Sequence, residues 1–276
     1  MHPVHFVEIA SLGVLAAFSL LEWKTGAWRE TLALAFALVV SSWLAEDTCI
    51  RLYEFYAYKP EWHVFLDQMP LMVALIWPFV VLSDLRVVRG ALGQDHRWMP
   101  VWTGILVFWD ACLMETVAAK AGLWTWFQPG LFDVPLIGLL GWGYFTAAAL
   151  FFWQRLKGRA RWAMLLLAPL ATHALLLATW WGGLRWVLRG PYPDEAVVVA
   201  GALGSLMLAV VVWKAKVKVP FLVMGPRILA AGVFFYLLWA YGRDDTWLVA
   251  FIATFVPPYL LATEWPWEGR GLPTQT

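Results

Sequence analysis

Apolar segments of membrane-spanning length recur along the whole 276-residue chain. Because the hydrocarbon core of a bilayer is about 30 Å thick, a helix that crosses it needs roughly 17 to 25 predominantly apolar residues. Segments close to this length lie at 4–21, 31–45, 68–83, 98–118, 134–153, 161–181, 196–213, 219–241 and 246–262. The second and third are short enough to be tilted or re-entrant. The chain is therefore predicted to be an all-α, polytopic transmembrane helix bundle with eight or nine spans.

The composition excludes several classes of protein. Hydrophobic residues make up 62% of the chain and charged residues only 14%, whereas soluble domains carry about 25% charged residues. The net charge of +1 provides no field that would attract nucleic acid, and basic loops suit anionic lipid headgroups instead. The two cysteines, Cys49 and Cys112, form no CxxC motif and are expected to be small apolar fillers. We predict a membrane protein surrounded by lipids, with no nucleic-acid partner and no metal centre.

The first apolar segment is expected to remain as a membrane anchor. His5 and Glu8 stand where a cleavable signal peptide carries basic residues, and no clear small-residue cleavage site follows before Glu22. Residues 1–263 are predicted to form a single transmembrane domain, followed by a polar tail over 264–276.

Lys and Arg are distributed unevenly between alternate loops. The richer loops are 23–30, 84–97, 154–160, 214–218 and the tail. The poorer loops are 46–67, 119–133, 182–195 and 242–245. By the positive-inside rule, this asymmetry predicts an N-terminus outside the cell and a C-terminus in the cytoplasm.

Two aromatic-rich loops, 46–67 and 119–133, are predicted to lie on the same side of the membrane. The first contains a YxxYxY run that ends at Tyr58, and the second contains the WxW pair Trp124 and Trp126. Trp and Tyr at a membrane interface usually form only an aromatic belt. Such a belt does not explain the acids that flank both loops. A second interpretation is that the two loops together roof a pocket.

Ionisable side chains also occur within the apolar segments or at their ends. They are Glu8, Glu46, Asp47, Asp110, Glu115, His173 and Arg227. An ionised group near the bilayer centre costs between about 2.5 and 17 kcal/mol, so each is a candidate functional residue. Asp110 is the strongest, because its neighbours offer no other polar group for a turn on either side. On a helix, Asp110 and Glu115 lie about 140° apart, so they need not share one partner.

Each candidate also has a purely structural interpretation. Asp110 can be a neutral, hydrogen-bonded packing residue, and His173 is more often a packing histidine than a catalyst. His5 and Glu8 share one helix face, either as a ligand pair or, more commonly, as an interfacial hydrogen bond. Arg227 follows Gly-Pro and can extend from a kinked helix toward a basic loop.

The residue types favour acid chemistry over redox or metal chemistry. The chain has no HExxH, GxSxG, GxGxxG, P-loop or histidine-box motif, so no cofactor is predicted. A carboxyl group enclosed by apolar side chains tends to keep its proton and can donate it. An alkene protonated in such a cavity becomes a carbocation, which aromatic faces stabilise by cation–π attraction. Capture by water gives hydration, and capture by an internal double bond gives cyclisation.

Residues 43–150 carry an ordered series of motifs: an acidic pair, a tyrosine-rich loop ending at a proline, an acidic helix, a GxWxW element, Val-Pro and Gly-Trp. The matching positions are Glu46, Tyr56, Tyr58, Pro70, Asp110, Gly122, Trp124, Trp126, Val134, Pro135, Gly141 and Trp142. This series resembles the prokaryotic carotenoid-biosynthesis membrane family, which includes gamma-carotene and bisanhydrobacterioruberin hydratases and is distantly akin to the heterodimeric lycopene cyclases. The sequence departs from the family at Glu115-Thr116, where Asp-Pro is expected, and at 138–140, where an Asn is expected.

The resemblance implies an enzyme of the prokaryotic inner (cell) membrane that hydrates or cyclises the end group of a carotenoid or isoprenoid without a redox cofactor. Asp110 and Glu115 are the candidates for the acid and the orienting base, with Glu46 and Asp47 at the mouth of the cavity. The candidates for lining the substrate are Tyr56, Tyr58, Trp124, Trp126, Trp142 and His173.

Two other functions fit the same residues. One is a non-enzymatic transporter or lipid-binding protein, whose intramembrane acids relay protons or bind cations. The other is a structural subunit of a larger complex, in which the aromatic side chains face protein.

Overall fold

The computed structural model describes residues 2–25, 28–93 and 96–265, and these residues form the predicted all-α helix bundle. Within them, eight helices are long and apolar enough to cross a membrane, and a shorter apolar segment follows at Thr246–Ala262. The protein is therefore an integral membrane protein. The helices are α1 (Pro3–Thr25), α2 (Trp28–Tyr53), α3 (Leu71–Leu92), α4 (Met99–Lys120), α5 (Leu136–Arg155), α6 (Met164–Leu176), α7 (Asp194–Lys214), α8 (Phe221–Leu237), α9 (Thr246–Ala253) and α10 (Val256–Ala262).

Short elements extend or connect these helices. The helical ones are η1 (Gly158–Ala163), η2 (Leu177–Trp181), η3 (Leu184–Trp186) and η4 (Leu238–Gly242). The strands are β1 (Tyr56–Tyr58), β2 (Phe65–Leu66), β3 (Met69–Pro70), β4 (Trp124–Trp126), β5 (Val219–Pro220) and β6 (Thr263–Glu264). They pair as β1 with β4 and β2 with β3, both antiparallel, and as β5 with β6 in parallel. Each strand has only two or three residues, so the strands join loops and leave the fold class unchanged.

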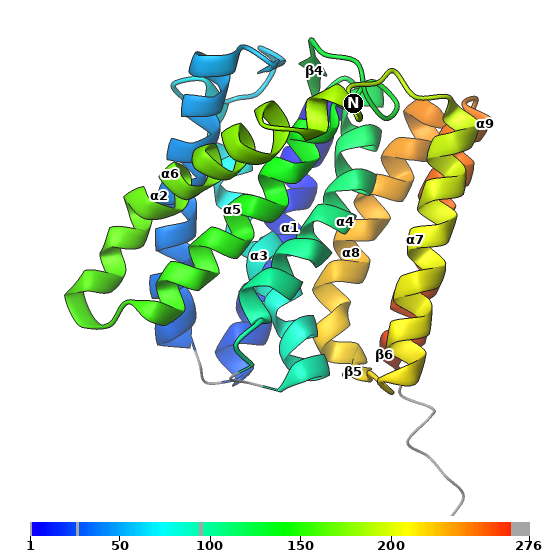
Figure 1. Ribbon diagram of the computed structural model, residues 1–276. Helices are drawn as coiled ribbons and strands as arrows, with labels where there is room; N and C mark the ends of the chain where they lie inside the picture. Colours follow the sequence, from blue (N-terminus) through cyan, green and yellow to red (C-terminus); the bar gives the residue numbers. More distant parts are fainter. Residues whose placement is uncertain (1, 26–27, 94–95, 266–276) are drawn as a thin grey trace, which may run out of the picture.

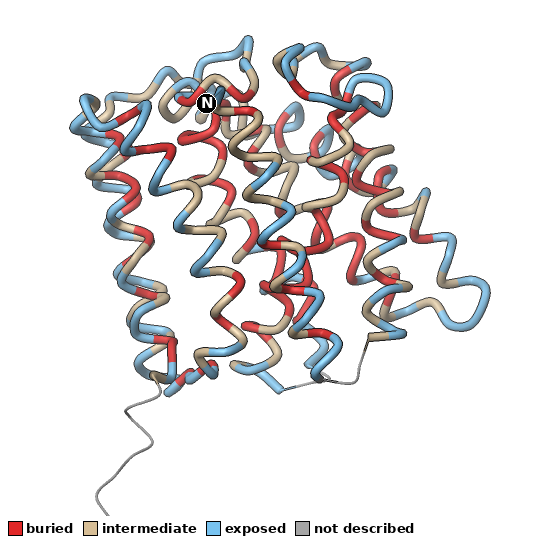
Figure 2. Tube along the Cα trace, turned by 180° about the vertical axis from the view of Figure 1, so that it is seen from behind, coloured by how far each residue is buried: buried red, intermediate tan, exposed pale blue. Residues whose placement is uncertain are grey.

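Five helices close into a ring, because α2 packs on α3, α3 on α4, α4 on α5, α5 on α6 and α6 on α2. The backbones of α4 and α5 approach closely where Gly104 faces Gly143, as small residues allow in membrane bundles. Outside the ring, α8 packs on α1, α3 and α4, and α7 packs on α9 and α10 (Figure 1). The central apolar window of α3 is 72% buried, against 17% for α1 and α7, so α3 is an interior helix and the other two face lipid (Figure 2).

Two helices are longer than the apolar runs that predicted them. The run at 31–45 becomes the 26-residue α2, because Asp47 pairs with Arg51 one turn later and Thr48 bonds back to the Leu44 carbonyl. The run at 68–83 becomes the 22-residue α3. This helix continues through Asp84 because Asp84 forms an ion pair with a neighbouring helix. Both segments are continuous helices that are long and apolar enough to span a membrane. Interhelical and intrahelical pairing allowed charged residues to continue both helices.

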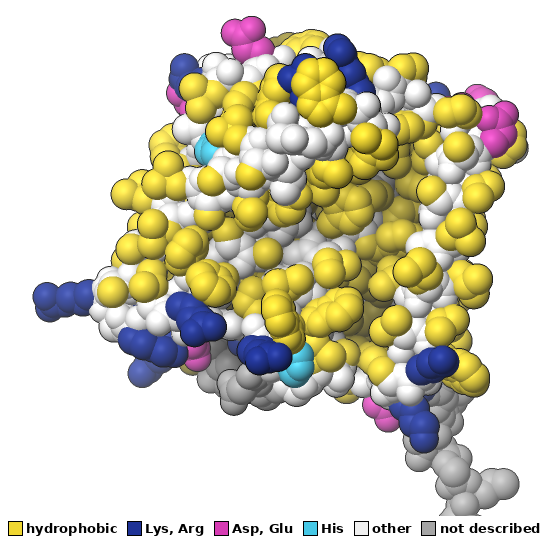
Figure 3. Space-filling view, viewed as in Figure 1, with side chains coloured by type: hydrophobic (Ala, Val, Ile, Leu, Met, Phe, Trp, Pro, Cys, Tyr) yellow, Lys and Arg dark blue, Asp and Glu magenta, His cyan; other side chains and the backbone are white. Residues whose placement is uncertain are grey.

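Both aromatic loops lie on the side of the bundle where the N-terminus lies (Figure 1). Hydrophobic side chains cover the middle of the molecule, and many of its Lys and Arg side chains gather at the opposite edge (Figure 3). The predicted polar tail at 264–276 falls almost entirely outside the described residues.

Candidate functional site

The two aromatic loops are joined directly by the pairing of β1 with β4. Tyr56 lies opposite Trp126, and Tyr58 lies opposite Trp124. Because side chains alternate along a strand, the central residues of the two strands point outward and the four aromatic rings point into the bundle. The rings of Tyr56 and Trp126 are 4.5 Å apart, centroid to centroid, and those of Tyr58 and Trp124 are 5.6 Å apart. The loops therefore form one aromatic roof.

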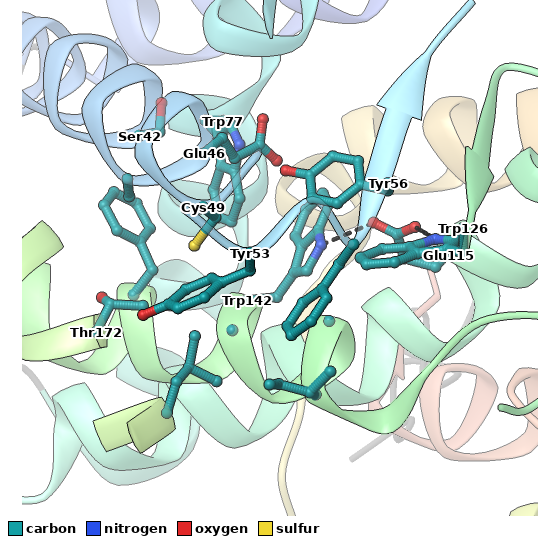
Figure 4. Close-up of a pocket in the computed structure, with 17 residues that line it drawn as sticks. Ser42, Glu46, Cys49, Tyr53, Tyr56, Trp77, Glu115, Trp126, Trp142 and Thr172 are labelled. Carbon is teal, nitrogen blue, oxygen red and sulfur yellow. Dashed lines mark hydrogen bonds between the residues drawn. The ribbon is translucent and has the colours of Figure 1, made fainter. Parts of the chain in front are cut away.

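Glu115 lies beneath this roof as the acceptor of three indole N–H groups. Its Oε2 atom accepts from Trp124 at 2.8 Å and from Trp126 at 3.1 Å, and its Oε1 atom accepts from Trp142 at 2.8 Å. The residue is 3% exposed. Three indole N–H donors from three different tryptophans therefore converge on the two oxygens of one buried carboxyl group. Figure 4 shows Trp126 and Trp142 turned toward this carboxylate.

Glu46, on α2, faces the same cavity with fewer partners. Its Oε2 atom accepts a 3.0 Å hydrogen bond from the Tyr58 hydroxyl. Burial, together with the nearby Glu46 carboxylate, raises the pKa of Tyr58 well above its usual value, so the phenol keeps the proton that it donates. The Trp77 side chain lies beside Glu46 (Figure 4), and its buried indole N–H interacts with that carboxyl group from beyond normal hydrogen-bond distance.

A cavity of about 70 Å³ separates the two glutamates from α6. Its wall is mostly apolar or aromatic and is contributed by α2, α3, α4, α5, α6 and the roof. The lining includes Glu46, Cys49, Tyr53, Phe55, Tyr56, Trp77, Glu115, Trp126, Ile137, Trp142, Thr172 and Leu176. Within residues 2–25, 28–93 and 96–265, no Lys, Arg or His forms a salt bridge with either glutamate. We call Glu46, Glu115, Tyr56, Tyr58, Trp77, Trp124, Trp126 and Trp142 the glutamate cluster.

The glutamate cluster is built from two copies of one structural unit. Each unit is a helix with a glutamate near its end, a strand with two aromatic residues, and a second helix that begins after a proline. Both second helices open with P-L-x-x-x-L-x-W, at 70–77 and 135–142. The last residues of these motifs, Trp77 and Trp142, stack with ring centroids 4.2 Å apart. The antiparallel β1–β4 pair and this stack relate the two units by approximate twofold symmetry.

Trp77 is the member of the cluster that the sequence analysis missed. Its equivalent in the second unit, Trp142, donates to Glu115, so Trp77 occupies the corresponding place beside Glu46. The shared P-L-x-x-x-L-x-W motif could have identified Trp77 from the sequence. The repeat is concealed because tyrosines in the first strand correspond to tryptophans in the second. The glutamate-to-proline spacing also differs, at 24 residues after Glu46 and 20 after Glu115.

A second charged cluster lies on the other side of α4. Arg227 of α8 forms ion pairs with Asp84 of α3 and Asp110 of α4, and it donates 3.0 Å hydrogen bonds to Ser83 and to the Tyr259 hydroxyl. Tyr259 in turn donates to Asp110. These five residues are the arginine cluster. All but Asp84 line a cavity of about 390 Å³ between α3, α4, α8 and α10.

The position of Asp110 differs from the expected one. Asp110 was predicted to act with Glu115, with a hydrogen-bonded packing role as the alternative; it lies in the arginine cluster and pairs with a cation 117 residues away in the sequence. The reason is geometric: five residues along α4 turn a side chain by about 140°, so Asp110 faces α8 whereas Glu115 faces the roof. Arg227 does not extend to a basic loop; it is held inside the bundle by these ion pairs.

Two further candidates lie outside the glutamate cluster. Asp47 accepts from Arg51 at 3.0 Å and from the Gln68 amide at 2.9 Å, which anchors the loop after α2. His173 lies 2.8 Å from the Thr48 hydroxyl and 3.0 Å from that of Tyr53, so it ties α6 to the end of α2 behind the cavity wall. The structure brings together Glu46, Glu115, Tyr56, Tyr58, Trp124, Trp126 and Trp142 of the predicted site.

Comparison of the chain with protein-family models, with curated proteins and with solved structures gives no match.

Proposed function

We propose that the protein is an enzyme of carotenoid or isoprenoid biosynthesis that hydrates or cyclises the end of a polyene by acid catalysis, without a redox cofactor. The observation that supports this most is the glutamate cluster: two carboxyl groups in a membrane-embedded cavity walled by indole and phenol rings. In the described part of the chain, neither carboxyl group has a cationic partner. A carboxyl group in such a place is suited to exchanging a proton with an apolar ligand.

The two glutamates have different surroundings, which supports different roles. Glu115 is held by three N–H donors and serves as a fixed negative charge. Glu46 accepts one hydroxyl and is the better proton donor. We therefore assign the acid to Glu46 and the electrostatic stabiliser to Glu115. Asp110, paired with Arg227, is not assigned to the reaction.

The first step transfers the carboxyl proton of Glu46 to the less substituted carbon of an isoprenoid double bond at the end of the chain. The π electrons form the new C–H bond, and the positive charge remains on the tertiary carbon. The Glu115 carboxylate and the faces of Trp77, Trp126 and Trp142 stabilise this cation. Such a site is preorganised because the two strands and the Trp77–Trp142 stack hold the rings in place.

The second step has two possible outcomes. In hydration, water adds to the cation and gives a proton to the Glu46 carboxylate, which leaves a tertiary alcohol. In cyclisation, an internal double bond attacks the cation, and a carbon next to the new cation returns a proton to Glu46. The indole N–H of Trp77 forms only a long contact with Glu46, so it can also donate to a water or hydroxyl oxygen, which supports hydration.

The cavity volume limits what can enter. At about 70 Å³ it takes only the end of a chain, so a long polyene would extend from it along the lipid-facing helices. We further propose that the roof faces the outside of a prokaryotic inner membrane and that the basic loops face the cytoplasm, in agreement with the positive-inside rule.

The test is expression in a lycopene-producing bacterial host, followed by liquid chromatography and mass spectrometry of the pigments. The wild-type protein should yield either a product heavier by one water or a cyclic isomer of unchanged mass. Glu46→Gln should lower product formation by roughly 10²- to 10⁴-fold, the usual contribution of a general acid. Glu61→Gln, which changes an exposed carboxyl group in the loop between β1 and β2, should leave product formation unchanged. Unchanged pigments with well-expressed wild-type protein would contradict the proposal for lycopene.

A proton-coupled transporter is the alternative function, and the arginine cluster is the observation that favours it. Charged residues paired inside a membrane bundle and lining a cavity are typical of ion and substrate pathways. The repeat found here is a parallel one, because α2 and α4 both run toward the roof, and it therefore differs from the inverted repeats of many transporters. Product formation in the pigment assay separates these two functions.

A further inference from the structure

A group of imidazoles and a carboxylate lies at the N-terminal end of α1, apart from both clusters. His2, His5 and Glu8 come from this end of the chain, and His63 comes from the loop between β1 and β2. The ring centroids of His2 and His5 are 5.6 Å apart, and those of His5 and His63 are 4.5 Å apart. We call these four residues the histidine cluster.

Glu8 is at the centre of the histidine cluster. Its Oε1 atom accepts a 3.0 Å hydrogen bond from the backbone amide of His63, which fixes the carboxylate, and its Oε2 atom contacts the His63 ring. The Nδ1 atom of His5 lies 3.6 Å from Oε2, is shielded from solvent and makes no hydrogen bond. Two imidazoles thus approach one carboxylate oxygen, and the His5 nitrogen does so from just beyond hydrogen-bond distance.

The ligand atoms of His5, Glu8 and His63 all lie within 4.8 Å of one another. Zinc binds imidazole nitrogen at about 2.0–2.1 Å and carboxylate oxygen at about 2.0–2.2 Å, so ligand atoms around a tetrahedral ion are roughly 3.3 Å apart. Small side-chain rotations would close this difference. The His63 side chain is 65% exposed and that of His5 is 40% exposed, so an ion can reach the group from the aqueous side.

We propose that His5, Glu8 and His63 bind a divalent transition-metal ion of the zinc type, with His2 able to serve as a fourth ligand. Imidazole and carboxylate are the donors that such ions prefer. The backbone amide of His63 acts as the outer hydrogen-bond donor that orients Glu8. The ion would join α1 to the loop that follows β1, and so would brace the roof of the glutamate cluster from outside. The site does not depend on the reaction proposed for that cluster.

The experiment uses full-length protein purified in detergent without a polyhistidine tag and stripped with a chelator. Calorimetric titration with Zn²⁺ should give one ion per chain, and Co²⁺ should develop the visible absorption of a tetrahedral site. His63→Gln and His5→Gln should each weaken Zn²⁺ binding at least tenfold and remove the Co²⁺ absorption. His96→Gln, an exposed histidine in the loop between α3 and α4, is the matched control and should bind as the wild type does.

Thermal unfolding provides a second measurement. An ion that binds only the folded protein raises the unfolding temperature, so Zn²⁺ should stabilise the wild-type protein and the His96→Gln variant but not His63→Gln. Absence of saturable Zn²⁺ binding would overturn the proposal. Equal affinity in the wild-type protein and the His5→Gln and His63→Gln variants would also overturn it, because the histidine cluster would then be only a hydrogen-bonded contact.

Discussion

The glutamate cluster and the arginine cluster both place acids inside the bundle, on opposite sides of α4. The two clusters differ in the groups that bind these acids. Asp84 and Asp110 share the cation Arg227. Glu115 is satisfied by neutral indole donors, and Glu46 by one phenol. The first arrangement gives the acids a cationic partner and fixes their side chains. The second leaves negative charge without a neutralising cation, so proton uptake or the approach of a cation is favourable there.

This difference indicates which acid a membrane protein can use for chemistry. An aspartate in a hydrogen-bonded ion pair would have to break strong contacts before it could donate a proton. A glutamate that accepts one hydrogen bond from a phenol would not have to break such contacts. The identity of the partner, rather than the presence of an acid in an apolar run, therefore separates a structural carboxylate from a reactive one.

The largest expected effect on stability concerns the arginine cluster. Arg227→Met leaves two buried carboxylates without their cation and should lower the free energy of unfolding in detergent micelles by about 3–5 kcal/mol. The triple variant that also carries Asp84→Asn and Asp110→Asn should recover much of this loss, because no unpaired charge remains. Arg243→Met, at an exposed position, is the control. An unaffected Arg227→Met variant would show that the cluster is not an ion-pair network.

The next largest effect is the difference in stability between variants of the two glutamates. Glu115→Gln replaces one acceptor oxygen by an amide donor that faces indole N–H groups, so we expect a loss of about 2–3 kcal/mol in the free energy of unfolding. Glu46→Gln keeps an acceptor for Tyr58 and should cost less than about 1 kcal/mol. Equilibrium unfolding of both variants measures the difference. Equal losses would mean that the two glutamates are held alike.

Gly138 lies where α5 packs against the roof, so a substitution there tests how tightly the roof is packed on α5. A Cβ atom at Gly138 would lie 2.3 Å from the Trp126 ring, so Gly138→Ala must displace that ring from Glu115. Overpacking of this kind costs about 1–3 kcal/mol. The quenching of tryptophan fluorescence should change together with stability. Gly232→Ala on α8, where a Cβ atom meets nothing, is the control. Equal behaviour of the two variants would contradict tight packing at the roof.

The smallest effect concerns an ion pair between Lys120, the last residue of α4, and Asp245, which precedes α9. Asp245 caps α9 through the Leu248 amide and accepts a 2.8 Å hydrogen bond from Lys120. Burial opposes the shift, but these hydrogen bonds lower the pKa of Asp245. Asp245→Ala should cost about 1 kcal/mol at neutral pH, the usual value of a cap. Asp244→Ala, whose side chain is fully exposed, should be neutral.

The pH dependence of that pair has a definite sign. Because the pKa of Asp245 is lowered on folding, its contribution to stability is complete above the pKa of an unfolded aspartate, near 4, and is lost as the pH falls through the folded value. The gap in stability between wild type and Asp245→Ala should therefore close below about pH 4. A gap that widens in acid would contradict the assignment.

The sequence by itself determined the helices and most of the residues of the glutamate cluster, although not Trp77. Hydropathy is a local property that adds along a chain, so the apolar runs predicted the spans, and Glu46, Glu115 and the two aromatic loops were visible as exceptions within or beside them. Only the tertiary structure decided which of these residues meet. Arg227 reaches Asp110 across 117 residues, and His63 reaches Glu8 across 55, distances at which no local pattern applies. Helix rotation and interhelical packing set those partners, and the partners set the charge that each acid can carry.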